Sequence, residues 1–129
     1  MENSNEKKKV LVVDDDENLR NVLIDKLNLS NFEVLGASDG EEGLDKALKI
    51  HPDAILLDVL MPKMDGWEML SELRKDKWGK DAKVIMLTVV EDTEAVSKAM
   101  EGGSFVYLIK TDLNLDEVVK KVEETLENN

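Results

Sequence analysis

Polar side chains that could act together follow four apolar runs of this chain. Asp14 and Asp15 follow the first run, and Asp58, Thr88 and Lys110 follow three later runs. In α/β proteins the carboxyl ends of parallel strands form the edge at which ligands bind. Carboxylates, a hydroxyl and an ammonium gathered at one such edge could hold a divalent cation, a carboxylate nucleophile and a phosphoryl group together.

Three carboxylates in one crevice repel one another, and the single positive charge of Lys110 cannot balance them. Mg²⁺ is a natural counter-ion because it prefers oxygen ligands and commonly binds through one or two carboxylates together with phosphate oxygens. Asp58 could attack a phosphoryl donor and form an aspartyl phosphate, with Asp14 and Asp15 holding the metal. Lys110 and the Thr88 hydroxyl could neutralise and position the phosphoryl oxygens. These residues predict a magnesium-dependent phosphoryl site.

The elements that must position this site alternate between two periodicities. Five short apolar runs, each of strand length, are separated by five segments of helical period, which predicts a (βα)5 α/β domain. The runs are Val10–Val13, Glu33–Ala37, Ala54–Leu57, Val84–Leu87 and Phe105–Ile109. Most are apolar at nearly every position, as is typical of parallel strands covered on both faces. We therefore expect a doubly wound parallel sheet of order 2-1-3-4-5, whose crevice lies between the carboxyl ends of strands 1 and 3.

The helical segments carry one apolar face each and several start signals. In the first helix the face that we expect against the sheet contains Leu19, Val22, Leu23 and Leu27. Ser38 or Asp39 could cap the second helix, and Asn114 with Glu117 resembles a capping box before the last helix. The third helix is expected after Asp65-Gly66, and the fourth is expected to end at Gly102-Gly103.

Length and composition favour one domain over residues 1–129, with a flexible polar lead-in at 1–8 and a polar tail at 127–129. The net charge of −12 argues against direct nucleic-acid or membrane binding. The chain has no cysteine, no signal-peptide pattern and no apolar stretch near the ~20 residues of a membrane span, so we expect a cytoplasmic protein. Because the chain ends soon after the last helix, output is expected to pass through another protein.

Several motifs in order resemble the receiver domain of two-component response regulators, in particular the chemotaxis-type single-domain receivers. They are Val-Val-Asp14-Asp15, Leu-Leu-Asp58-Val-Leu-Met-Pro62-Lys-Met-Asp65-Gly66, Met-Leu-Thr88 and Tyr107-Leu-Ile-Lys110. The resemblance implies the flavodoxin-like form of the doubly wound fold. It implies that Asp58 accepts a phosphoryl group from a sensor histidine kinase or a phosphotransfer protein. Asp15 would bind Mg²⁺ directly, Asp14 mostly through water, and the Leu60 carbonyl would be a further ligand; Mn²⁺ could replace Mg²⁺. Lys110 and Thr88 would contact the phosphoryl oxygens.

The family also implies a switch and a receiver that is not a turnover enzyme, although it takes part in its own phosphotransfer and autodephosphorylation. Thr88 would move toward the phosphate and Tyr107 would turn inward behind it, which would rearrange the face made by helix 4, strand 5 and helix 5. That face would signal to a downstream protein and could form a phosphorylation-dependent homodimer.

The chain departs from the family pattern at a few positions. Thr111 stands where members usually have a proline with a cis bond, so the Lys110-Thr111 bond could be trans. Gly103 replaces a common alanine. Leu60 and Val90 stand where some receivers have polar side chains that orient the hydrolytic water. Because neither side chain can hydrogen-bond water, we expect slow self-dephosphorylation.

Two other classes of function fit part of the pattern. In a haloacid-dehalogenase-type phosphatase, Asp14 of the Asp14-x-Asp16 pair would be the nucleophile, although Asn18 and the short chain fit that family poorly. A pseudo-receiver would signal without phosphate, and the missing proline after Lys110 is compatible with it.

Overall fold

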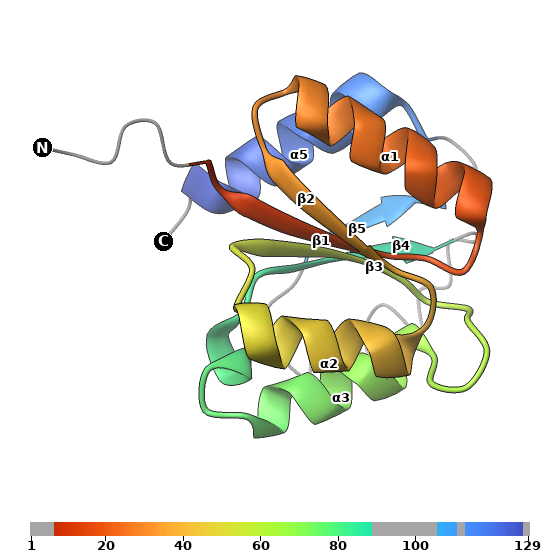
Figure 1. The fold of residues 1–129 in the computed structure, drawn as a ribbon, viewed down its shortest axis with the longest axis vertical. Helices are drawn as coiled ribbons and strands as arrows, with labels where there is room; N and C mark the ends of the chain where they lie inside the picture. The colour runs from red at the N-terminus through yellow and green to blue at the C-terminus, as the bar shows by residue number, and fades with distance from the viewer. Residues whose placement is uncertain (1–6, 89–105, 111–112, 128–129) are drawn as a thin grey trace, which may run out of the picture.

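The computed structural model describes residues 7–88, 106–110 and 113–127. Its five parallel strands form one sheet of order β2-β1-β3-β4-β5, as the sequence predicts (Figure 1). The strands are β1 (Lys9–Val13), β2 (Glu33–Ala37), β3 (Ala54–Asp58), β4 (Val84–Thr88) and β5 (Val106–Ile109). The helices are α1 (Glu17–Leu29), α2 (Gly40–Ile50), α3 (Gly66–Lys75) and α5 (Leu115–Glu127), with a 3₁₀ turn η1 (Gly79–Asp81).

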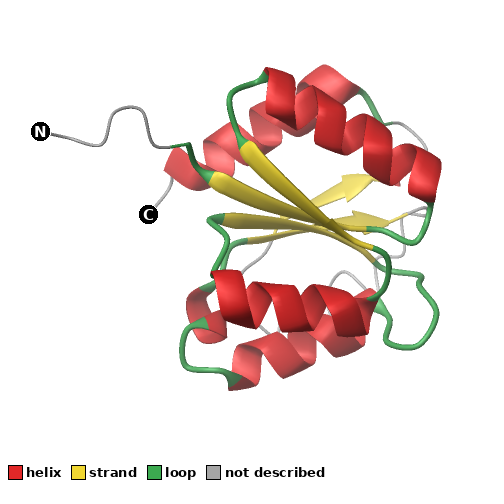
Figure 2. Ribbon diagram, in the orientation of Figure 1, coloured by secondary structure: helices red, strands yellow, loops and turns green. Residues whose placement is uncertain are grey.

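Helices cover both faces of the sheet, with α1 and α5 on one face and α2 and α3 on the other (Figure 2). The alternation of side chains along β1 explains the two layers, because Val10 and Val12 pack with α1 and α5 while Leu11 and Val13 pack with α2 and α3. The central strands are buried on both sides, which accounts for their unbroken apolar runs.

Most element boundaries agree with the predicted ones, and the differences have local causes. Val22 is 45% exposed rather than packed on the sheet, so its predicted place on the inner face of α1 is wrong. The buried stripe of α1 follows Leu23 and Leu27, and Val22 lies at its edge because neighbouring helix positions are about 100° apart. Helix α5 includes Glu127, which the sequence suggests as part of the tail.

Three aspartates begin helices at the carboxyl edge of the sheet. Asp16, Asp39 and Asp65 each accept a hydrogen bond from the backbone N–H three residues later, at the start of α1, α2 and α3 respectively. Asp39, and not Ser38, is therefore the cap of α2. Asn114 Oδ1 likewise accepts from the N–H groups of Asp116 and Glu117 before α5. These caps fix where each helix begins relative to the strand that precedes it.

Within the described residues, no helix has the length and apolar character that a membrane crossing needs. The expected fourth helix, Val90, Gly103 and the Lys110-Thr111 peptide lie outside the described residues.

Candidate functional site

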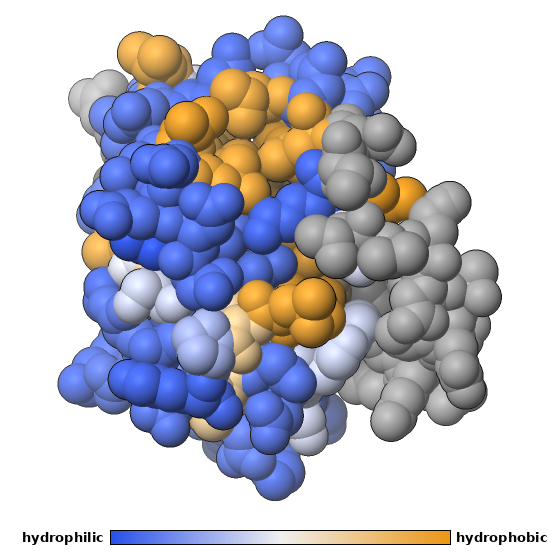
Figure 3. Space-filling model, turned by 90° about the vertical axis from the view of Figure 1, so that its right-hand side faces the viewer, coloured by the Kyte–Doolittle hydropathy of each residue, from blue (hydrophilic) through white to orange (hydrophobic). Residues whose placement is uncertain are grey.

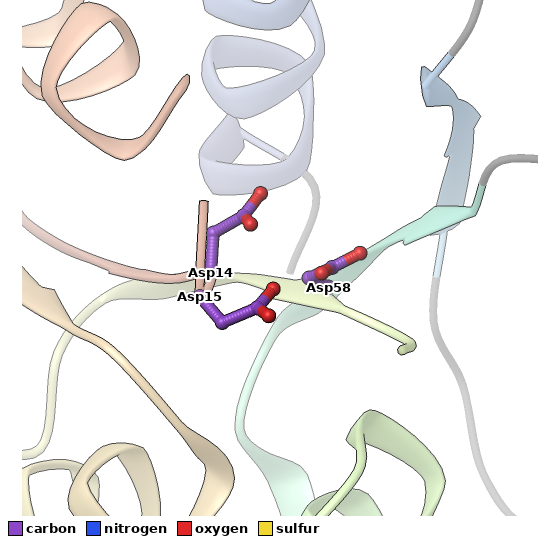
Figure 4. Close-up of side chains that lie close together, drawn as sticks. All are labelled: Asp14, Asp15 and Asp58. Atoms are coloured by element: carbon purple, nitrogen blue, oxygen red, sulfur yellow. The ribbon is translucent and has the colours of Figure 1, made fainter. Parts of the chain in front are cut away.

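The predicted acidic residues meet at the carboxyl ends of β1 and β3. Asp14 and Asp15 directly follow β1, and Asp58 is the last residue of β3, the neighbouring strand. One carboxylate oxygen from each of the three lies within 4.8 Å of the others. Figure 4 shows the three side chains close together at the ends of their strands. Asp14 and Asp58 are buried, whereas Asp15 is exposed, so the cluster opens to solvent on the Asp15 side.

Lys110 reaches this cluster from the position directly after β5, the strand at the far edge of the sheet. Its Nζ is 3.2 Å from Oδ1 of Asp58 and 3.1 Å from Oδ2 of Asp14, and the Lys110 side chain is 15% exposed. It also donates a hydrogen bond of 3.3 Å to Oδ1 of Asp14. One ammonium is therefore the counter-ion of two buried carboxylates.

The site changes the pKa values of its groups. Burial raises the pKa of Asp58 to about 6, and the negative charge of Asp14 adds to this shift while Lys110 opposes it. For Lys110, burial acts to lower the pKa, but the charges of Asp58 and Asp14 outweigh it and the pKa is raised overall. The pocket thus holds more negative charge than its lysine neutralises.

The donor set fits a hard divalent cation. Three carboxylates converge, and Mg²⁺ prefers oxygen ligands of this kind. The Oδ2 atom of Asp14 is fully buried and receives no hydrogen bond from any described residue, although Lys110 lies near it. A buried carboxylate oxygen in that position has a lone pair to offer to a cation or to water that a cation holds.

The other predicted residues lie around the cluster. Thr88 ends β4 one position beyond Leu87, the strand partner of Asp58. Tyr107 is on β5 and is 42% exposed. Leu60 follows Asp58 by two residues and is 65% exposed. The face of the molecule in Figure 3 has apolar areas between polar ones.

The loop after Asp58 is held closely against two helix starts. The N–H of Gly66 donates to the carbonyl of Val59 at 2.8 Å, and a Cβ on Gly66 would collide with the carbonyl oxygen of Asp58. Lys63 has a φ of 67° and pairs with Asp39 at 3.7 Å. The loop after Asp58 therefore has little freedom at its base.

Two acidic-loop contacts were not anticipated from the sequence. Asp16 is occupied as the cap of α1 and accepts from the N–H of Leu19 at 3.2 Å. Arg20 Nη1 donates to the carbonyl oxygen of Asp14 at 2.7 Å. The sequence does contain a signal for the Arg20 contact. A positive charge in the first turn of a helix is disfavoured by the helix dipole, so such a residue is expected to have a partner outside its helix.

Residues 10–123 match the sequence profile described as the response regulator receiver domain. The chain belongs to this family. This receiver domain is 41% identical over 104 residues to the probable transcriptional regulator ycf27 of Cyanophora paradoxa. The aligned residues make up 81% of this chain and 42% of that protein. It is also 41% identical over 103 residues to the alkaline phosphatase synthesis transcriptional regulatory protein PhoP of Bacillus subtilis, covering 80% of the chain and 42% of that regulator.

Solved structures share the fold of this receiver domain. The chemotaxis protein CheY4 of Vibrio cholerae superposes with a TM-score of 0.87 at 32% identity, covering 93% of this chain and 99% of that one. A putative response regulator from Chloroflexus aurantiacus gives a TM-score of 0.87 at 32% identity, covering 95% and 100%. The chain spans about two fifths to one half of the length of its curated ycf27 relatives.

Family membership disfavours both rival classes. A haloacid-dehalogenase-type phosphatase is not favoured, since the profile that residues 10–123 match is that of the receiver domain. A pseudo-receiver is likewise not favoured, since the family profile matches most of the chain. The receiver domain therefore functions in phosphorelay signalling and belongs to a signalling family rather than to a family of catalytic enzymes.

Proposed function

We propose that this receiver accepts a phosphoryl group on Asp58 from a phosphohistidine of a sensor histidine kinase or phosphotransfer protein. The observation that carries the proposal is the pairing of the Asp58 carboxylate with Lys110 inside a cluster of three carboxylates. A buried carboxylate with a raised pKa, held beside a cation, is a functional-site signature.

In the transfer, an oxygen of the Asp58 carboxylate attacks the phosphorus atom and forms an acyl phosphate. The bond from phosphorus to the histidine nitrogen breaks, and its electron pair returns to that nitrogen. The ammonium of Lys110, already 3.2 Å from Asp58, would pair with one oxygen of the incoming phosphoryl group. The hydroxyl of Thr88 would donate a hydrogen bond to another phosphoryl oxygen. Apart from its nucleophile, the protein contributes positioning and charge neutralisation.

Asp14, Asp15 and Asp58 would hold Mg²⁺, together with the backbone carbonyl of Leu60, and Mn²⁺ could take the same place. Asp15 is the exposed member of the set and would bind the ion directly, while buried Asp14 would act mostly through water. When bound, the ion neutralises charge on the phosphoryl oxygens. Its two positive charges would also oppose the burial and the repulsion from Asp14 that together raise the pKa of Asp58.

Phosphorylation would act as a switch. Thr88 would move toward the new phosphate, and Tyr107, exposed here, would turn inward into the space that Thr88 vacates. The rearranged surface of helix 4, β5 and α5 would bind a downstream protein or a second phosphorylated copy. The net charge of −12 favours a protein over a nucleic acid as that partner.

Loss of the phosphoryl group would be slow, and the receiver would not turn over like an enzyme. Water must attack phosphorus opposite Asp58, which then leaves as a carboxylate. Leu60, two residues after Asp58, is exposed and has no side-chain group that can hydrogen-bond the water. The whole of residues 1–129 would form this one receiver domain, with 1–8 as a lead-in.

Mass spectrometry after incubation with acetyl phosphate and Mg²⁺ tests the proposal. We expect the intact protein to gain one phosphoryl group and the Asp58→Asn variant to gain none. Asp16→Asn is the matched control, because asparagine caps a helix as well as aspartate does and Asp16 is already occupied by that role. Equal phosphorylation of the Asp58→Asn variant, or none of the wild-type protein, would contradict it.

A further inference from the structure

Arg20 binds the backbone of the acidic loop at the peptide that joins its two carboxylates. The guanidinium Nη1 donates to the carbonyl oxygen of Asp14 at 2.7 Å in a partly buried position. That carbonyl belongs to the same planar unit as the N–H of Asp15. Whatever fixes the carbonyl therefore also fixes the direction in which the chain enters Asp15.

The place of Arg20 on α1 needs an explanation beyond helix stability. It is the fourth residue of a helix that begins at Glu17, where the helix dipole disfavours a positive charge. Its aliphatic stem passes over β2 at Gly36, where an added Cβ would lie 3.4 Å from Cδ of Arg20 and 2.9 Å from Cδ1 of Ile24. An added side chain at Gly36 would crowd Ile24, and it would come only into ordinary contact with this stem.

The other polar groups of Asp14 are already held. Its N–H donates to the carbonyl of Ala37 on β2 at 3.1 Å. Its Oδ1 accepts from the N–H of Asp16 at 2.9 Å, and Lys110 contacts its carboxylate. The Arg20 bond fixes the remaining group, the carbonyl. Asp15 is exposed, so its aim depends on the peptide before it.

We propose that Arg20 is a positioning residue of the metal site, which aims the Asp15 carboxylate at the cation by holding the Asp14-Asp15 peptide. Arg20 touches no reacting atom and acts through the backbone. This inference rests on the proposed function, because it takes Asp15 to be a direct ligand of Mg²⁺.

Charge and positioning make opposite predictions for Arg20. A positive charge near a cation site weakens cation binding, so removal of the charge alone would tighten Mg²⁺ binding. Loss of an outer hydrogen bond that orients a ligand weakens metal binding, typically by about tenfold or more. The sign of the change in Mg²⁺ affinity therefore separates the two.

The test compares Arg20→Met with Lys26→Met by calorimetric titration with Mg²⁺. Lys26 lies on the same helix and pairs with Asp116 of α5 at 2.8 Å, so its replacement removes the same charge with no contact to the acidic loop. We expect Arg20→Met to bind Mg²⁺ about tenfold more weakly and Lys26→Met to bind it unchanged or slightly more tightly. Arg20→Met binding Mg²⁺ as well as Lys26→Met would overturn the proposal.

Two further measurements distinguish a positioning role of Arg20 from a general loss of folded structure in the variant. In the Mg²⁺-free protein, the Asp14 carbonyl ¹³C and the Asp15 amide ¹⁵N resonances should shift in Arg20→Met and stay in place in Lys26→Met. Phosphorylation by acetyl phosphate should need more Mg²⁺ for half-maximal rate, yet approach the wild-type rate at saturating Mg²⁺. Arg20→Lys, which keeps the charge, should have a Mg²⁺ affinity between those of Arg20→Met and the wild-type protein. It replaces Arg20→Met in the test if that variant does not fold.

The outcomes also distinguish the two levels of proposal. A wild-type protein that takes up neither Mg²⁺ nor a phosphoryl group contradicts the proposed function and this inference together. A wild-type protein that does both, with unchanged Mg²⁺ affinity and Asp15 resonances in the Arg20 variants, contradicts the role of Arg20 alone.

Discussion

Lys110 and Asp58 form an ion pair of 3.2 Å although β4 lies between their two strands. The same ammonium contacts the fully buried Asp14. Two carboxylates of the site therefore depend on one residue at the end of the edge strand. Removing that residue leaves buried negative charge without a partner, which is among the more costly changes that a folded protein can suffer.

Lys110→Met should lower the free energy of unfolding by about 3–5 kcal/mol in metal-free buffer, because Asp14 and Asp58 lose their buried counter-ion. Urea unfolding followed by circular dichroism measures it. Mg²⁺ should restore part of the loss. Lys121→Met is the control, since Lys121 pairs with Glu124 at 3.6 Å near the surface, where such pairs contribute about 0–1 kcal/mol. Equal losses in both variants would contradict the expectation.

Asp58→Asn should stabilise the metal-free protein at neutral pH. The folded protein keeps the Asp58 proton up to about pH 6, whereas an unfolded chain releases it near pH 4. Between these values the folded state binds more protons, so this group lowers stability as the pH rises and its penalty is complete above pH 6. The variant should gain on the order of 2 kcal/mol at pH 7.5.

The same comparison at pH 4 supplies the control for Asp58→Asn. At pH 4, close to the unfolded pKa, the folded state is protonated and the unfolded state is about half protonated, so most of the gain should vanish there. Urea unfolding in the presence of EDTA at both pH values gives the two differences. A gain that is independent of pH would show that packing, and not ionisation, separates the variant from the wild-type protein.

Mg²⁺ should raise the melting temperature of the wild-type protein, and Asp15→Asn should abolish most of that rise. A ligand at a hundred times its Kd stabilises a protein by about 2.7 kcal/mol. Scanning calorimetry with MgCl₂ against NaCl of equal ionic strength measures the specific effect. Asp16→Asn should keep the rise, because the Asp16 side chain accepts from the N–H of Leu19 and caps α1. Retention of the full rise in Asp15→Asn would remove Asp15 from the metal site.

Leu60→Asn should shorten the lifetime of the phosphorylated protein several-fold. An amide at this exposed position can hydrogen-bond the attacking water, which leucine cannot, although the gain should stay below the ~10²-fold of a general base. Loss of radioactive phosphate from the isolated phosphoprotein measures the rate, with Leu29→Asn as a control at an exposed leucine on α1. A wild-type lifetime of seconds that Leu60→Asn leaves unchanged would refute slow self-dephosphorylation.

Gly66→Ala should destabilise the protein more than Gly43→Ala. A Cβ on Gly66 meets the backbone carbonyl of Asp58, which cannot move without disturbing the site, so a loss of about 1–3 kcal/mol is expected. The three atoms nearest to a Cβ on Gly43 all belong to side chains, those of Val13 and Met69, and the Met69 side chain can shift more easily than a backbone carbonyl. Thermal unfolding ranks the two variants, and the reverse ranking would show that the loop at Asp58 yields more easily than the core.

The sequence alone predicted the sheet order and the members of the acidic cluster. The order follows from the common doubly wound arrangement that has five parallel strands, and the cluster follows from two local rules. Unbroken apolar runs identify buried parallel strands, and the residues after such runs lie at one edge. The sequence alone therefore predicted that Asp14, Asp15 and Asp58 lie close together. The cap at Asp39 could be narrowed to two adjacent residues, because helix start signals are also local.

Only the tertiary structure decided which atoms meet within that edge. Lys110 reaching past β4 to Asp58 and Asp14, Arg20 holding the Asp14 carbonyl, and Val22 facing solvent all depend on how helices rest on the sheet and how far long side chains extend. Sequence periodicity carries no information about such reach. The raised pKa of Asp58 is of the same kind, because burial and neighbouring charge exist only once distant strands have assembled.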